Sequence, residues 1–308
     1  MLIYVSKRLL QAIPTLLIVI TLSFFLMHLA PGGPFDGERQ LPAEIEANLR
    51  AAYHLDQPVW RQYFIYLGNL LQGDFGPSFR YKDFTVTELI AQGFPVSLEL
   101  GLWAIALAIA VGLPLGILAA LHRNSSIDYL VMGTALAGVA IPNFVIAPVL
   151  ALVFGVLLAW LPVGGWNDGH WRNMVLPVIA LSIQQVAYIA RMSRASMIEV
   201  LGSHYIRTAR AKGLSEREVI WRHALRPSLL PVVSYLGPAI AGIITGSVVI
   251  EQIFGIPGIG RYFVQAALNR DYTLVMGTVV FYGILIVLLN LIVDLLYSAL
   301  DPQIRYDD

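Results

Sequence analysis

The sequence contains none of the short motifs that carry out covalent chemistry. There is no G-x-x-x-x-G-K-[ST] loop to hold nucleotide phosphates, no G-x-S-x-G serine, no G-x-G-D aspartate and no H-E-x-x-H site. The six histidines do not have the spacing of metal ligands, and the absence of cysteine excludes disulfides and thiol catalysis. We therefore expect no catalytic residues and no metal site, so the chain should not be an enzyme.

One acidic residue, Glu251, ends an apolar run that glycines and prolines interrupt. Charged side chains at membrane depth are costly, and they usually line a pathway or have a partner. The following stretch GIPGIGR has no lysine and no preceding strand, which favours a turn at the membrane surface over a phosphate site. An outer gate or pathway segment is therefore predicted at Glu251, Gly255, Pro257 and Gly258.

A basic segment, YIRTARAKGLSEREVIWRHALRP, occupies residues 205–227. Helix-forming residues from about Ser196 lead to Gly213, a residue type that commonly ends helices. Ser215 and Glu218 then have the spacing of a capping box, in which each side chain binds the other residue's backbone N–H. The segment therefore predicts two helices joined at the glycine, with the second ending before the proline that begins the next span.

Three functions fit a basic loop of this kind in a membrane protein. Cations that only anchor the loop at the cytoplasmic face need neither a capping box nor a fixed bend. A nucleic-acid reader needs a free recognition helix, which a loop tethered to the bilayer at both ends does not offer. An elbow, meaning two helices joined at a fixed bend, that inserts into a partner protein explains both the ordered structure and the positive charge of this segment. Leu214 and Val219 support a fixed bend, because they have the spacing of a hydrophobic staple. We favour the partner elbow, with anchoring second.

The composition requires these segments to be held by membrane spans. Of the 308 residues, 57% are hydrophobic and 13% are charged, whereas soluble domains average about 25% charged residues. The charge-free runs are 9–29, 100–121, 129–162, 173–190, 227–250 and 272–293.

The run at 129–162 is too long for a single upright helix. Its two prolines, Pro142 and Pro148, therefore predict a short interfacial helix, a kink and then one span.

The distribution of Lys and Arg predicts the topology. With six spans and the N-terminus inside, the cytoplasmic pieces hold twelve basic residues, eight of them from Arg191 to Arg226, against three in the short outer loops. A seventh span would move this cluster outside, against the positive-inside rule. We therefore predict an all-α polytopic membrane protein with six transmembrane helices and both termini in the cytoplasm.

One outer segment is large, at residues 31–95. It begins with PGGP and ends with GFP, and both favour chain breaks. Two short helices are expected in it, at about 43–54 and 57–71, with Asp56 as a cap and Gly73 after the second. Its many aromatic residues fit either a small cap over the spans or a docking surface for an external partner, and both interpretations stay open.

Several stretches resemble the oligopeptide/dipeptide permease family of binding-protein-dependent ABC importers. The most specific is RTARAKGL with RHAL, although only Ala209 and Gly213 match the general importer pattern E-A-A-x-x-x-G-x9-I-x-L-P. Others cover the whole chain: KRLLQAIPTL, HLAPGGPF, GDFGPSF, IPNFVIAPVL, VVIEQIFGIPGIGRYFVQAALNRDY and VDLLYSALDPQIRY. Within the family, the resemblance is to the B-type inner-membrane subunits.

The resemblance implies a division of the chain and a location in the bacterial inner membrane. The expected parts are an N-terminal transmembrane helix (1–30), a periplasmic segment (31–95), a five-helix MetI-like permease core (96–300) with a cytoplasmic coupling loop (194–227), and a cytoplasmic tail (301–308).

The resemblance also implies a function, namely a translocation path for oligopeptides or dipeptides formed with a second, C-type permease subunit. Two ATP-binding subunits would hold ATP and Mg, so this chain would carry no cofactor, and a periplasmic peptide-binding protein would deliver the peptide. Membrane lipid is an expected partner and nucleic acid is not. The alternative is an ion-coupled secondary transporter, although the sequence lacks the paired broken helices typical of that class. The expected ATPase contacts are Ala209, Gly213, Leu214, Ser215 and Glu216.

Overall fold

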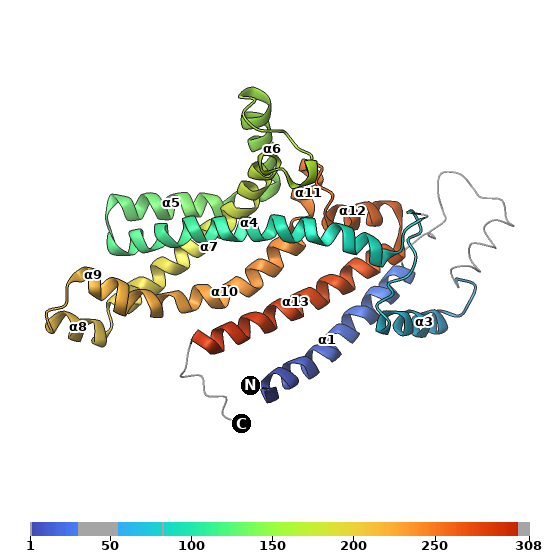
Figure 1. The fold of residues 1–308 in the computed structure, drawn as a ribbon, viewed down its shortest axis with the longest axis horizontal. Helices are drawn as coiled ribbons and strands as arrows, with labels where there is room; N and C mark the ends of the chain where they lie inside the picture. Colours follow the sequence, from blue (N-terminus) through green and yellow to red (C-terminus); the bar gives the residue numbers. More distant parts are fainter. Residues whose placement is uncertain (1, 30–54, 82, 301–308) are drawn as a thin grey trace. The chain divides into compact units, whose positions relative to one another are not determined.

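The computed structural model describes residues 2–29, 55–81 and 83–300, and nearly all of these are helical (Figure 1). Within these ranges there is no strand, only an isolated bridge between Pro77 and Thr85. The predicted all-α class is confirmed. The helices are α1 (Leu2–Leu29), α3 (Val59–Leu71), α4 (Val86–Leu121), α5 (Ser126–Ala140), α6 (Asn143–Leu150), α7 (Trp171–Leu201), α8 (His204–Ala211), α9 (Glu216–Glu218), α10 (Leu225–Gly246), α11 (Val248–Phe254), α12 (Ile259–Asn269) and α13 (Tyr272–Leu300).

Five helices are long and apolar enough to cross a membrane, and a bent pair makes a sixth candidate, in agreement with the predicted six spans. The pair joins Ser126–Ala140 to Asn143–Leu157 at an angle of 100°. The bend falls at Pro142, the N-cap of α6, where the expected kink lies. Beyond it the chain is not one plain helix, because seven π-helical residues, Ala151–Leu157, follow α6. The five helical spans are 10–29, 86–121, 171–201, 216–245 and 272–293.

Two sequence expectations about the outer segment are wrong. α4 does not begin after GFP but at Val86, and it continues past that proline. The reason is a capping box, because Thr85 Oγ1 accepts from Glu88 N at 3.2 Å and Glu88 Oε2 accepts from Thr85 N at 2.8 Å. The N-cap of α3 is Pro58 rather than Asp56. The expected helix at 43–54 and the tail at 301–308 lie outside the described residues.

The chain forms two compact units. The first unit comprises Ser97–Ile256 with the chain from Ile286, and the second comprises Leu2–Val96 with Pro257–Leu285. In the first unit, α7 packs against α5, α6 and α10. It also packs against α4 at Gly112 and Gly116, which are spaced as G-x-x-x-G. A Cβ on Gly112 would lie 2.7 Å from Val186 O, so only glycine permits this close approach.

A buried carboxylate organises the second unit. Asp271 precedes α13 and is fully buried. Its oxygens accept hydrogen bonds from Ser78 Oγ at 2.5 Å and from Leu274 N at 3.1 Å. Backbone N–H groups of Phe79 and Arg80 also donate to it, at 3.2 and 3.3 Å. This one side chain therefore joins the loop before α4 to the start of α13.

Candidate functional site

The basic segment forms an elbow, but its arms differ from the expected ones. The predicted first helix is broken, because α7 ends at Leu201 and α8 begins only after Gly202 and Ser203, the latter in an extended conformation. The second arm does not end before Pro227. A π turn, Val219–Ala224, leads from α9 directly into α10. Proline is tolerated there because the π turn already interrupts the i→i−4 hydrogen bonds.

The predicted capping box is confirmed. Ser215 Oγ accepts from Glu218 N at 3.4 Å, and Glu218 Oε2 accepts from Ser215 N at 3.2 Å. Leu214 and Val219 pack in one apolar cluster, as a hydrophobic staple requires. The start of the second arm is therefore fixed by contacts within five residues of sequence.

Gly213 makes the bend possible through its backbone conformation. Its φ is +83°, in the left-handed region that glycine adopts without strain. Its N–H donates to Arg210 O at 2.9 Å, and the next N–H, of Leu214, donates to Ala209 O at 3.3 Å. No atom lies within 4 Å of the position that a Cβ would take. A side chain at this position would therefore be opposed by the dihedral angle and not by crowding.

An ion pair crosses the bend. Arg210 Nε donates to Glu216 Oε1 at 2.7 Å, and Arg210 Nη2 donates to Glu216 Oε2 at 3.0 Å. The hydrogen bond to this carboxylate raises the pKa of the Arg210 guanidinium. Sequence reasoning missed the pair, although an Arg and a Glu on either side of a tight turn are a usable signal.

The inside of the elbow is apolar. Ala209 is only 7% exposed and packs with Ile206, Val219 and Ala224. The same cluster contains Ala120 from α4 and Met197 from α7. Ala209 therefore lies in the core of the elbow, and this core continues into two of the spanning helices.

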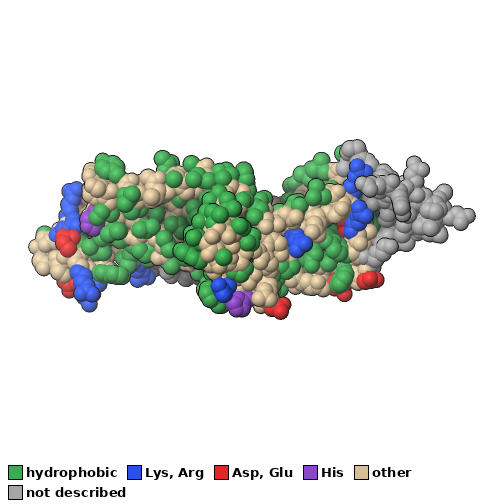
Figure 2. All heavy atoms as spheres, turned by 90° about the horizontal axis from the view of Figure 1, so that it is seen from above, with side chains coloured by type: hydrophobic (Ala, Val, Ile, Leu, Met, Phe, Trp, Pro, Cys, Tyr) green, Lys and Arg blue, Asp and Glu red, His purple; other side chains and the backbone are tan. Residues whose placement is uncertain are grey.

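The outside of the elbow is basic and partly aromatic. Gly213, Ser215 and Glu216 are exposed and Leu214 is half-buried. Trp221 also lies on this surface and is 65% exposed. Figure 2 shows Lys and Arg side chains at its left end, where Figure 1 places α8 and α9. Of the five predicted contact residues, four therefore face outward or lie at the surface.

The second predicted site contains a buried carboxylate. Glu251 is fully buried on α11, one helix beyond the end of α10. Ser97 Oγ, from α4, donates to its Oε1 at 2.7 Å, and Ser247 Oγ lies 2.5 Å from the same oxygen. The carboxylate therefore joins α4 to the junction between α10 and α11.

The residues after Glu251 form a turn with defined backbone angles. Gly255 is left-handed, with φ +64°, and ends α11. The loop at 164–165 holds this end, because Gly165 N donates to Phe254 O at 2.6 Å. Gly258 is the N-cap of α12. The four predicted gate residues are divided between the units, with Glu251 and Gly255 in the first and Pro257 and Gly258 in the second.

Among the described residues, no group of three His, Cys, Asp or Glu side chains could hold a metal ion.

Residues 112–306 match the family described as binding-protein-dependent transport system inner membrane component, and residues 1–101 match its N-terminal counterpart. The chain belongs to this family. The permease is therefore an inner-membrane subunit of a binding-protein-dependent ABC importer, which works with ATPase and binding-protein subunits and is not itself an enzyme. The ion-coupled alternative is set aside.

Relatives of the permease are similar along their whole length. The oligopeptide transport system permease protein OppB of Haemophilus influenzae is 58% identical over 306 residues, 99% of this chain and 100% of that protein. The OppB protein of Escherichia coli K12 has the same identity and coverage. The dipeptide transport system permease protein DppB of Bacillus subtilis is 46% identical over 302 residues, 98% of this chain and 97% of that protein.

A solved structure shares the fold. The MetNI methionine ABC transporter, in inward-facing conformations, matches with a TM-score of 0.60 over 69% of this chain and 96% of the other, at 18% identity. The predicted MetI-like permease fold is confirmed by this likeness.

Proposed function

We propose that this permease carries oligopeptides across the membrane, along a path that it forms with a second, C-type permease subunit. Support comes from the 58% identity over 99% of the chain to permeases named for oligopeptide transport. The identity to a permease named for dipeptide transport is lower, at 46%. Oligopeptides are therefore the preferred substrate class, and dipeptides are the alternative.

The proposed complex has two ATP-binding subunits, which bind ATP and Mg, and a periplasmic peptide-binding protein. The charge distribution supports a cytoplasmic elbow, because eight basic residues lie from Arg191 to Arg226. ATP hydrolysis would then take place on the same side of the membrane as the elbow, and the peptide would be delivered on the other.

The elbow is the proposed contact with the ATPase. The observation that carries this role is that its shape is fixed from within, by the capping box, the Arg210–Glu216 pair and the apolar cluster. The outer surface is left available for a partner. Because Ala120 and Met197 belong to the same cluster, a force on the elbow acts directly on α4 and α7.

The buried Glu251 supports a second element of the mechanism, an outer gate. Its hydrogen bonds to Ser97 and Ser247 join α4 to the α10–α11 junction. A movement of α11 therefore either breaks these hydrogen bonds or moves the two serines along with it. Gly255 supplies a left-handed end to α11 that other residues adopt only with strain. We propose that this junction shapes the outer end of the path.

Replacing Gly213 tests the coupling role. A non-glycine residue at φ +83° costs about 1–2 kcal/mol, and a β-branched one more, so Gly213→Val should change the bend. We expect the complex to assemble in the membrane while peptide uptake per ATP hydrolysed falls. The measurement is peptide uptake and ATPase activity of the whole complex in proteoliposomes, with co-purification of the ATPase as a second readout.

Gly213→Asn is the matched control, because asparagine tolerates the left-handed conformation. It should retain coupling even though it adds a side chain to the exposed surface. Normal transport and normal ATPase binding by Gly213→Val would show that the bend is not needed. Equal losses in both variants would assign the effect to the surface rather than to the backbone.

Competition of long peptides against dipeptides for uptake by the unmodified complex tests the substrate class separately.

A further inference from the structure

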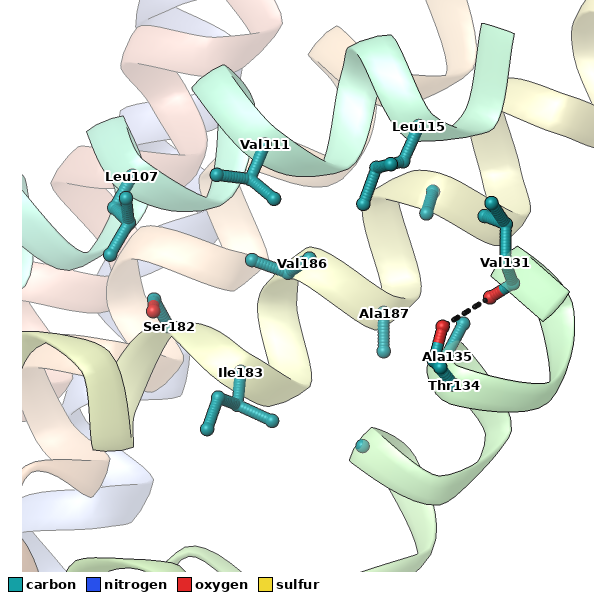
Figure 3. A pocket seen from close by; sticks show the side chains of 12 residues that line it. Leu107, Val111, Leu115, Val131, Thr134, Ala135, Ser182, Ile183, Val186 and Ala187 are labelled. Atoms are coloured by element: carbon teal, nitrogen blue, oxygen red, sulfur yellow. Dashed lines mark hydrogen bonds between the residues drawn. The ribbon is translucent and has the colours of Figure 1, made fainter. Parts of the chain in front are cut away.

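An apolar groove runs along α4, α5 and α7 in the first unit. Figure 3 shows its walls. Its volume is about 270 Å³. Leu107, Val111 and Leu115 line it from α4, and Ile183 and Val186 line it from α7. The groove is separate from the elbow and from the Glu251 cluster.

The two hydroxyl groups on the wall of the groove are already satisfied. Thr134 Oγ1 donates within its own helix, 3.0 Å from Val131 O, and Ser182 Oγ donates to Ile179 O at 3.0 Å. Water therefore finds few partners on this wall, and an apolar occupant is favoured. An apolar cavity of about 150 Å³ already binds a benzene molecule, so this groove has room for part of a hydrocarbon chain.

The groove has room for part of an acyl chain. Leu107 to Leu115 spans eight residues of α4, about 12 Å of rise. An acyl chain can lie along this length against the apolar walls, and the charge at one end of the groove favours a lipid over an apolar helix.

One end of the groove is charged. Arg194 lies one turn beyond Ala190 on α7, and Asp128 lies one turn before Val131 on α5. Arg194 donates to Asp128 through Nε at 2.5 Å and through Nη2 at 2.7 Å. Since Asp128 is only 1% exposed, this ion pair closes the groove on the side of the turn between α4 and α5.

A second arginine leaves this end with an excess of positive charge. Arg123 is exposed on the turn between α4 and α5, and its charge acts on Asp128 as well. Arg123 and Arg194 therefore carry two positive charges at this end of the groove, against the one negative charge of Asp128. We infer that the groove is a binding site for one membrane phospholipid with an anionic headgroup, whose acyl chain lies between α4, α5 and α7 and whose phosphate meets Arg123 and Arg194. This inference rests on the spanning helices and does not depend on the transported substrate.

Filling the groove tests the acyl-chain site. The probes are phosphatidylglycerol and phosphatidylcholine with identical chains, titrated into the delipidated whole complex and counted by native mass spectrometry. Val111→Trp, at a groove-lining position that is 38% exposed, should remove one bound phosphatidylglycerol per copy of this chain. Leu136→Trp is the matched control, since Leu136 is 62% exposed and does not line the groove. Thr134→Phe fills the groove from α5 and replaces Val111→Trp if that variant does not assemble.

Neutralising the charged end tests the headgroup. Arg123→Gln should weaken phosphatidylglycerol binding about fivefold and leave phosphatidylcholine binding unchanged. Arg61→Gln, at an exposed position on α3, is its control and should change neither. Equal lipid counts in the complexes with and without Val111→Trp would overturn the site. Equal binding of the two lipids to the unmodified complex would overturn the anionic preference. The chain has no cysteine, so Val111→Cys can be cross-linked alone, and capture of another protein chain would show a helix as the occupant.

Discussion

Replacing Asp271 with asparagine should release the loop before α4 without disturbing the first unit. The carboxylate accepts five hydrogen bonds. Oδ1 accepts from Phe79 N, Leu274 N and Thr273 Oγ1, and Oδ2 accepts from Ser78 Oγ and Arg80 N. Asparagine keeps one acceptor oxygen but presents an NH2 group where the other oxygen lies. At best it therefore retains the three bonds of Oδ1.

The size of the effect follows from the two bonds at Oδ2. A hydrogen bond to a charged group contributes about 1.5–3 kcal/mol. The Ser78 hydroxyl already accepts from Arg80 N at 3.2 Å and from Tyr81 N at 2.9 Å, so it cannot also accept from the new NH2, and its own bond to Oδ2 is lost. Arg80 N loses Oδ2 but keeps its bond to Ser78 Oγ. With the charge also gone from the remaining bonds, we expect a loss of about 3 kcal/mol in local stability. This corresponds to about a 100-fold rise in opening of the loop.

Amide hydrogen exchange of the complex in nanodiscs measures this opening directly. Exchange at Phe79 and Arg80 should become about 100-fold faster in Asp271→Asn, while α10 keeps its rates. Asp74→Asn is the control, because exposed Asp74 accepts one bond, from Gly76 N at 2.8 Å, in the same loop. It should change exchange by less than about tenfold. Unchanged rates in Asp271→Asn, or equal changes in both variants, would refute the assignment of Asp271 as the residue that holds this loop.

Two further predictions concern the first unit. Gly116→Val should lower the thermal stability of the complex by about 3 kcal/mol, because its Cβ would overlap the Ala190 carbonyl and lie 2.7 Å from Ser193 Cβ. Gly133→Val, with no atom near the Cβ position, should leave the melting temperature nearly unchanged, and equal melting temperatures would contradict the close packing of α4 on α7. Glu251→Ala should reduce both stability and peptide uptake, since Ser97 loses a buried acceptor at about 1–3 kcal/mol, while Ser247 can still donate to Ile244 O. Glu251→Gln keeps an acceptor and should retain more uptake in the same assay.

The parts of the fold that depend on neighbours in the sequence could be predicted. The bend at Gly213 and the box from Ser215 to Glu218 need only residues within one turn, and both are present. The kink at Pro142 is equally local. The start of α4 at Val86 was missed, because GFP was taken as a chain break and the spacing of Thr85 and Glu88 was not used.

The contacts that depend on distant residues could not be predicted from one sequence. Ser78 and Asp271 are 193 positions apart, and no periodicity of either segment indicates that they meet. Ser97 and Glu251 are 154 positions apart. The burial of Ala209 was missed as well, because the predicted contact set followed the motif and ignored which helix face packs inward. Local rules thus recover the shape of the elbow, and only the three-dimensional packing shows which of its residues remain available.

The two arms of the elbow have unequal mechanical properties. The first arm is separated from α7 by Gly202 and an extended Ser203, which makes a joint. The second arm continues as one helical stretch from Glu216 to Thr245, about 45 Å of rise, with the π turn Val219–Ala224 inside it. Under the proposed coupling role, the joint lets the first arm turn relative to α7, whereas the second arm is continuous with α10. A displacement at Glu216 would then reach α10 along the chain itself, and reach α4 and α7 through the packing of the apolar cluster.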